Sequence, residues 1–135
     1  MVEMLKFRKN LLVLNALFLG LTGFLQMIFE LLSHFRGIGP LGSIFTNTPY
    51  TIGFFEAHGF AVLTAVLVFG VMLKDLKPHW HLYLALVCLL LGGANLLFWD
   101  SFAKVGLVAA GYIATSLHIL FFGLQTFSFI KTRKE

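Results

Sequence analysis

The sequence predicts an all-α integral membrane protein: a single domain over residues 1–135 whose four helices form an up-down transmembrane bundle. The first observation behind this prediction is composition. The 135 residues are 59% hydrophobic and only 12% charged, with a mean hydropathy of +0.89, whereas a soluble fold needs a charged exterior. The second is that the apolar residues gather into four runs, each long enough to cross a hydrocarbon core of about 30 Å. We therefore expect membrane lipid to surround the protein.

The basic residues lie at the ends of the apolar runs and predict the orientation of the bundle. The formal net charge is +4, but this placement is that of membrane-flanking charges, so nucleic acid is not expected as a partner. Two connections on one side of the membrane carry only Arg36 and Lys104. The other basic residues lie on the opposite side, where the positive-inside rule places the cytoplasm: Lys6, Arg8, Lys9, Lys74, Lys77, Lys131, Arg133 and Lys134. Both termini are therefore expected to be cytoplasmic (N-in, C-in), in the plasma (inner) membrane if the protein is bacterial.

The first span is predicted over residues 10–34. It follows a basic head, as the core of a signal peptide does, but it lacks a small-x-small cleavage site and is expected to be retained. Its polar residues fall near helical spacing on one side, which should face protein: Asn15, Thr22, Gln26, Glu30 and Ser33. The following loop, 36–51, is rich in Gly and Pro and is either a lid over one end of the bundle or a plain exposed loop.

The second span, predicted over residues 52–73, opens with Glu56 and His58. Ionisable groups are costly in hydrocarbon, so these two residues are candidates for a functional site. Side chains two residues apart on a helix point about 200° from each other, so both cannot face the bundle axis. Either His58 faces a neighbouring helix while Glu56 reaches the headgroup region, or the helix begins later.

The third span is predicted over residues 79–99. His79 and His81 at its start are interpreted as interfacial residues beside Trp80, which belongs to the aromatic belt, with a metal site as the alternative. Farther along the span, small and polar residues at helical spacing form a packing face: Cys88, Gly92 and Asn95.

The fourth span is predicted over residues 103–130. One of its faces carries residues at helical spacing: Gly111, Thr115, His118, Phe122 and Gln125. His118 lies near the middle of the span, where a buried histidine needs hydrogen-bond partners. We therefore expect a polar group from another helix to meet it.

With both termini inside, several polar residues converge at the outer half of the membrane. Glu30, Glu56 and His58 bring ionisable groups there and are predicted as candidate catalytic residues. The candidate ligand-binding residues are Gln26, Asn95, Asp100, Tyr112, Thr115 and His118. Together they predict an outward-facing polar pocket. The alternative is that the carboxylates reach water and the amides only hold helices together.

The sequence does not identify a cofactor, and no metal site is assigned. Glu56 and His58 have the wrong spacing for a carboxylate-bridged metal pair, although a single metal ion held by Glu30, His34, Glu56 or His58 is an alternative. Haem between His58 and His118 is another alternative. With the predicted spans these two histidines differ in depth by roughly 13 Å, which argues against one haem. A quinone-like molecule is the preferred candidate.

Two local patterns carry a resemblance to a known family. The first span contains the glycine-spaced stretch LFLGLTGF at 17–24, and Glu56 is followed by Gly59 at the start of the second. With the chain length and the four spans, these patterns resemble the DoxX-like membrane family. The resemblance implies a four-helix membrane bundle, in some members associated with the oxidation of thiosulfate or other sulfur compounds coupled to quinone. Only Glu56 carries over as a site residue.

These observations lead to three hypotheses of function. The leading one is a small integral membrane protein whose outer-leaflet polar pocket binds a lipophilic or quinone-like molecule, in one version as a redox or enzymatic subunit. The second is a structural or accessory subunit of a larger membrane complex. The third is a proton-coupled transporter of small solutes, for which the bundle would form a homo-oligomer.

Overall fold

The computed structural model describes residues 2–133, and these fold into helices with no strand among them. The long helices are α1 (Val2–Arg36), α3 (Thr51–Leu67), α4 (Pro78–Leu97) and α6 (Val108–Thr132). The short ones are α2 (Gly42–Phe45) and α5 (Trp99–Lys104), and a π-helical turn, η1 (Val68–Met72), extends α3. Lys134, which was counted among the inner charges, lies outside the described residues.

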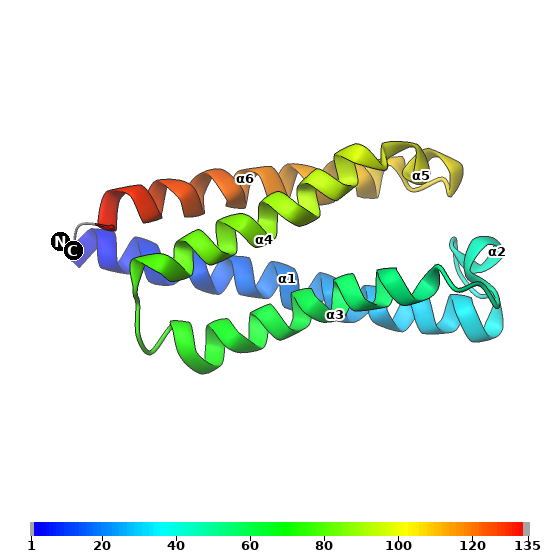
Figure 1. The fold of residues 1–135 in the computed structure, drawn as a ribbon, viewed down its shortest axis with the longest axis horizontal. Helices are drawn as coiled ribbons and strands as arrows, with labels where there is room; N and C mark the ends of the chain where they lie inside the picture. Colours follow the sequence, from blue (N-terminus) through cyan, green and yellow to red (C-terminus); the bar gives the residue numbers. More distant parts are fainter. Residues whose placement is uncertain (1, 134–135) are drawn as a thin grey trace.

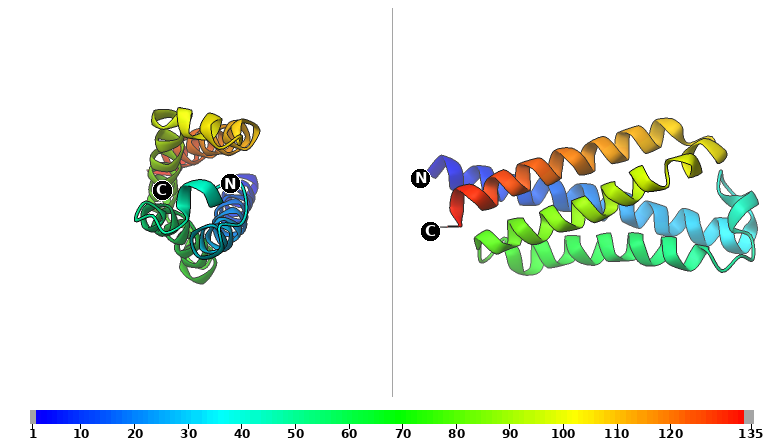
Figure 2. Two further views of the ribbon diagram at one scale, coloured as in Figure 1. Left: turned by 90° about the vertical axis from the view of Figure 1, so that its right-hand side faces the viewer. Right: turned by 45° about the horizontal axis from the view of Figure 1, so that its top comes forward.

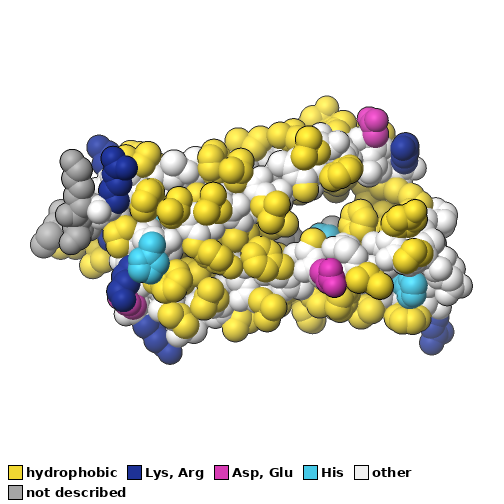
Figure 3. All heavy atoms as spheres, viewed as in Figure 1, with side chains coloured by type: hydrophobic (Ala, Val, Ile, Leu, Met, Phe, Trp, Pro, Cys, Tyr) yellow, Lys and Arg dark blue, Asp and Glu magenta, His cyan; other side chains and the backbone are white. Residues whose placement is uncertain are grey.

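Four helices are long and apolar enough to cross a membrane: Val2–Arg36, Thr51–Met72, Pro78–Leu97 and Val108–Thr132. The all-α class and the four apolar spans are therefore confirmed. Figure 3 shows hydrophobic side chains over the middle of the visible face and Lys and Arg side chains at its two ends. This distribution is the one expected where the middle of a protein faces lipid and its ends face water.

Two helix boundaries differ from the sequence prediction. α1 begins at Val2 instead of near residue 10, because its basic N-terminal segment contains no Gly or Pro that would interrupt a helix. α6 begins at Val108 instead of near residue 103, because residues 99–104 form α5 and Gly106 then turns the chain with φ +71°. Residues of the fourth span therefore lie closer to the start of their helix than predicted.

The long helices pack as two pairs, α1 with α3 and α4 with α6. The pairs lie close together at the end that carries both termini and diverge toward the end that carries α2 and α5 (Figures 1 and 2). The buried apolar core belongs to the half where the pairs meet, with residues from 11–19, 61–72 and 84–88 and Phe121. In the other half, Figure 3 shows a hollow between the two pairs, which we call the cleft.

Small residues bring α3 close to α1. A Cβ atom added at Gly23 would lie 2.8 Å from the His58 carbonyl oxygen, and one at Gly20 would lie 3.0 Å from the Ala65 Cβ. Small residues let helix backbones approach closely in membranes. The glycines of the 17–24 stretch therefore place the turn of α3 that contains His58 directly against α1.

Gly92 and Gly93 are neighbours in α4, yet the same substitution is expected to have opposite effects at the two positions. A Cβ at Gly92 would lie 2.9 Å from the His118 Cβ, whereas nothing lies within 4 Å of one at Gly93. We expect Gly92→Ala to lower the free energy of unfolding by about 1–2 kcal/mol through overpacking. Gly93→Ala should leave it unchanged or raise it by up to about 1 kcal/mol through helix propensity. Unfolding by SDS in mixed micelles measures both, and equal values would contradict the close contact between α4 and α6.

Candidate functional site

Glu30 in α1 and His58 in α3 form an ionisable pair in the half of the molecule that contains the cleft. His58 Nδ1 lies 2.5 Å from Glu30 Oε1; the Glu30 side chain is fully buried and that of His58 is 31% exposed. The second carboxylate oxygen, Glu30 Oε2, is buried and has no hydrogen-bond partner within residues 2–133. Leaving a buried polar atom unsatisfied costs free energy, so this oxygen is a candidate contact point for a water molecule or a ligand.

Glu56 does not join this pair. Its side chain is exposed, while His58, two residues farther along α3, faces α1. Of the two arrangements considered from the sequence, the structure has the one in which the histidine faces a neighbouring helix. The alternative of a later helix start is wrong, because α3 begins at Thr51.

His118 comes from the other helix pair. It is 8% exposed, its Cβ lies against Gly92, and its ring meets that of Phe18 edge-on with 5.0 Å between centroids. Its Nδ1 atom is buried and has no hydrogen-bond partner among the described residues. The polar partner that the sequence predicted for His118 is thus absent from the described chain, and a ligand could take its place.

The start predicted for the fourth span is wrong, because α6 begins at Val108 and His118 lies ten residues inside it, while His58 lies seven residues inside α3. The two histidines still contact different levels of α1. His118 packs on Phe18, whereas the His58 carbonyl oxygen faces Gly23 and the His58 ring pairs with Glu30. The depth argument against one haem between them therefore stays a prediction.

The other candidate residues are spread over the same half of the molecule. Gln26 and Asn95 are partly buried, and Asp100 and Tyr112 are exposed. Thr115 is buried and lines a groove between α4 and α6. Glu30 and His58, which contact each other, and His118, which packs on Phe18 and Gly92, are the buried or partly buried ionisable residues taken as the candidate site.

The loop that follows α1 is tied to the ends of α1 and α3. His34 Nδ1 lies 3.0 Å from the Phe45 carbonyl oxygen and 3.2 Å from Thr51 Oγ1, and Phe45 is buried. The His34 ring thus connects the end of α1 to the loop and to the start of α3. Within residues 2–133, no group of three or more His, Cys, Asp or Glu side chains converges in a way that could hold a metal ion. A lid function of the loop stays a prediction.

A second polar cluster, which the sequence analysis did not find, joins α1, α4 and α6 near the end that carries the termini. We call it the buried network; its members, none more than 4% exposed, are Arg8, Asn15, His81, Cys88 and Gln125. Arg8 Nε lies 3.2 Å from His81 Nε2, and His81 Nδ1 lies 2.6 Å from Gln125 Oε1. Gln125 Nε2 donates to Asn15 Oδ1 at 3.0 Å, and Asn15 Nδ2 lies 3.6 Å from the Cys88 sulfur.

The hydrogen bonds of the buried network have one consistent direction. Arg8 can only donate, so His81 Nε2 accepts, and Nδ1 carries the proton that is donated to Gln125. Gln125 in turn donates to Asn15. The interpretation of His81 as a solvated interfacial residue is therefore wrong, whereas His79 is exposed beside Trp80. A polar network whose members have partners fixes the arrangement of the helices that supply them.

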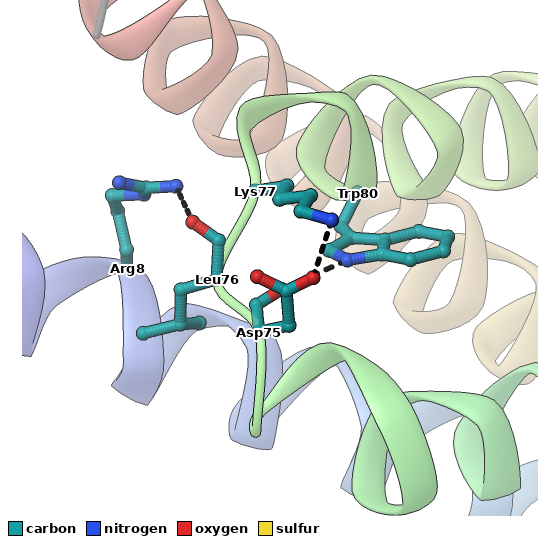
Figure 4. A network of polar contacts seen from close by, with 5 residues as sticks. All are labelled: Arg8, Asp75, Leu76, Lys77 and Trp80. Carbon is teal, nitrogen blue, oxygen red and sulfur yellow. Dashed lines mark hydrogen bonds and ion pairs between the residues drawn. The ribbon is translucent and has the colours of Figure 1, made fainter.

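Arg8 also connects α1 to the segment between η1 and α4 (Figure 4). Its Nη2 atom donates to the Leu76 carbonyl oxygen at 2.5 Å. In the same segment, Lys77 pairs with the Asp75 carboxylate at 2.7 Å and Trp80 Nε1 donates to the Asp75 carbonyl oxygen at 2.9 Å. Arg8 is thus a buried structural residue of the basic head.

The buried network could have been predicted from the spacing of its residues in the sequence. Arg8 and Asn15 are seven residues apart, and so are His81 and Cys88, which places each pair on one face of its helix. The packing face recognised at Cys88 and Gly92 extends back by two turns to His81. The burial of His81 was missed because the neighbouring Trp80 is typical of the membrane interface, which favoured an interfacial interpretation of the whole segment.

Aromatic rings lie between the buried network and His118. Phe18 stacks on Phe121 with 5.6 Å between centroids and also contacts the His118 ring. Both phenylalanines belong to the apolar cluster around Cys88. The candidate site and the buried network are therefore two separate polar regions.

Comparison with known proteins found no protein-family model, no curated protein and no solved structure that matches this chain. The resemblance to the DoxX-like family therefore stays a prediction.

Proposed function

We propose that the protein binds a lipophilic molecule with a quinone-like polar head in the cleft between its two helix pairs. The observation that carries this proposal is the fully buried Glu30 carboxylate, whose Oε2 has no partner within residues 2–133. His118 Nδ1 on the other pair is buried and equally without a partner there. A ring that carries hydrogen-bonding groups at its edges could offer a partner to either atom, and its apolar tail would extend into lipid.

The chemistry of the three residues fits a ligand that exchanges protons. A hydroquinone hydroxyl would donate to Glu30 Oε2, and a quinone carbonyl would accept from His118 when its Nδ1 is protonated. The hydrogen-bonded Glu30 and His58 can hold or release a proton next to the ligand. His58 is partly exposed, so the pair can exchange protons with its surroundings. These are the properties of a membrane redox or enzymatic subunit.

The proposed arrangement in the membrane is an up-down bundle with both termini in the cytoplasm. The basic residues at the end that carries the termini support this orientation by the positive-inside rule. The cleft then opens in the outer half of the membrane, which is the plasma membrane if the protein is bacterial. A quinone-like molecule would enter it from the surrounding lipid.

Cysteine labelling tests this orientation. Ser43 in α2 and Lys74 after η1 are exposed and lie at opposite ends of the molecule, and the native Cys88 is only 1% exposed. A membrane-impermeant maleimide should label Ser43→Cys in intact cells and Lys74→Cys only after permeabilisation. The reverse pattern would place the termini outside, and labelling of both from one side would contradict the up-down arrangement.

The proposed function is tested by ligand binding to the purified protein. Mass spectrometry of the molecules extracted from protein purified in mild detergent should find a quinone-like compound. Titration with a short-chain benzoquinone should show saturable binding at one site. Partitioning without saturation would contradict the proposal and favour an accessory subunit. A Soret band would assign the cleft to haem, and proton-dependent solute flux in liposomes would favour a transporter.

A further inference from the structure

A groove on the α4–α6 pair is separate from the candidate site. It is lined by Leu96, Trp99, Tyr112, Thr115, Ser116 and Ile119 and has a volume of about 270 Å³. All of its lining comes from residues 96–119, so α1 and α3 take no part. Pockets that enclose a small molecule usually have about 300–1,000 Å³. This groove therefore suits a portion of a longer amphiphile.

Most of the residues that line the groove are open to the surroundings of the molecule. Leu96, Tyr112 and Ile119 are each more than half exposed, at 56%, 61% and 54%. All three lie on helices that are long and apolar enough to cross a membrane. The molecules with the most ready access to the groove are therefore those of the bilayer itself.

Thr115 supplies the groove with a polar group that has no partner. The residue is 5% exposed, and its hydroxyl oxygen is buried without a hydrogen-bond partner within residues 2–133. A helical threonine can satisfy its hydroxyl on the carbonyl of the preceding turn, as Thr22 does on the Phe18 carbonyl at 2.6 Å. Because Thr115 does not, its hydroxyl is left for an acceptor that enters the groove, which the hydroxyl can meet after a small rotation of the side chain.

The positions of the lining residues match the layers of a lipid. Trp99 and Tyr112 pack with 4.6 Å between ring centroids, and such aromatic residues lie at the headgroup level of membranes. Thr115 lies one turn farther along α6, about 4.5 Å deeper, and Ile119 follows one turn beyond it. In this order the groove presents an aromatic layer, a hydroxyl and an apolar layer.

We propose that this groove binds one phospholipid through its ester region. An ester carbonyl accepts a hydrogen bond from the Thr115 hydroxyl, the aromatic pair covers the glycerol region, and an acyl chain packs along Leu96 and Ile119. A larger apolar groove of about 600 Å³ lies between α1 and α3, but no polar side chain lines it. It therefore offers no comparable means of selecting a lipid.

The test compares two lipids that differ only in the ester carbonyls. Delipidated full-length protein receives an equal mixture of diester and diether phosphatidylglycerol of the same chain length, and native mass spectrometry measures which lipid stays bound. One hydrogen bond predicts that the wild-type protein retains the diester lipid about fivefold more than the diether lipid. Thr115→Val, which removes the hydroxyl and keeps the side-chain shape, should abolish this preference.

Two further variants complete the test. Thr22→Val removes a hydroxyl that is bonded within its own helix and should keep the wild-type preference, and Thr115→Ser should keep it because the hydroxyl remains. Equal retention of the two lipids by wild-type protein would overturn the proposal, and so would a preference that survives in Thr115→Val. Displacement of the lipid by a short-chain benzoquinone would assign the groove to that ligand instead. Glu30→Gln should leave the lipid preference intact, so failure of this proposal is distinct from failure of the proposed function.

Discussion

Replacing Gln125 with leucine is expected to lower the free energy of unfolding by about 3 kcal/mol, because it leaves two buried polar groups without partners at about 1–3 kcal/mol each. Gln125 accepts from His81 and donates to Asn15, and all three side chains are fully buried. Leucine has a similar volume, so loss of packing contributes little. The effect should appear as a shift of SDS-induced unfolding in mixed micelles.

Gln26→Leu is the matched control for this substitution. Gln26 is a partly buried residue of α1 outside the buried network, so its replacement should change the free energy of unfolding by at most about 0.5 kcal/mol. Asn15→Ala should be strongly non-additive with Gln125→Leu, since the two residues share one hydrogen bond. Equal effects of the two glutamine substitutions would show that the buried network does not hold the helices together.

Glu30→Gln is expected to weaken the binding of a short-chain benzoquinone in its reduced form by about tenfold or more. A hydrogen bond to a charged group contributes about 1.5–3 kcal/mol, which corresponds to about 10–100-fold in affinity. Glutamine keeps the shape of Glu30 and can still accept from His58, but it offers no second carboxylate oxygen to the ligand. Titration of the purified protein under reducing conditions measures the dissociation constant.

Glu56→Gln is the control for the loss of charge. Glu56 lies on the same helix as His58 but is exposed and faces away from Glu30, so the dissociation constant should stay within about twofold of the wild-type value, as for surface substitutions. His118→Phe should weaken binding as Glu30→Gln does, since it removes the polar atom on the other side of the cleft. If Glu56→Gln weakened binding more than Glu30→Gln, the site would lie elsewhere.

The fold class and the four spans could be predicted from the sequence because the mean hydropathy of a segment of about twenty residues depends little on the position of any single residue. The helix boundaries were less predictable. The start of α6 depends on α5 and on Gly106, whose backbone turn becomes visible only in the structure. Composition also does not reveal that the two helix pairs diverge, because the same apolar residues face lipid or another helix with little difference in hydropathy.

The candidate site was partly predictable for a similar reason. Ionisable residues in apolar runs are rare, so Glu30, His58 and His118 were easily identified as candidates. The pairing of Glu30 with His58 depends on Gly23, which lets α3 approach α1 at His58. His81 was misassigned because the same sequence position can face water or protein, and the choice depends on Gln125, 44 residues away in the chain.

The divergence of the two helix pairs gives the protein a tapered outline (Figure 1). It is narrow where the buried network and the apolar core hold the pairs together, and wide where α2 and α5 lie. A tapered protein occupies unequal areas in the two leaflets of a bilayer. In the proposed orientation, the wide end occupies the outer leaflet and the narrow end the inner one. Such unequal areas favour curvature of the surrounding bilayer, so the tapered shape relates the spacing of the two helix pairs to the mechanics of the membrane.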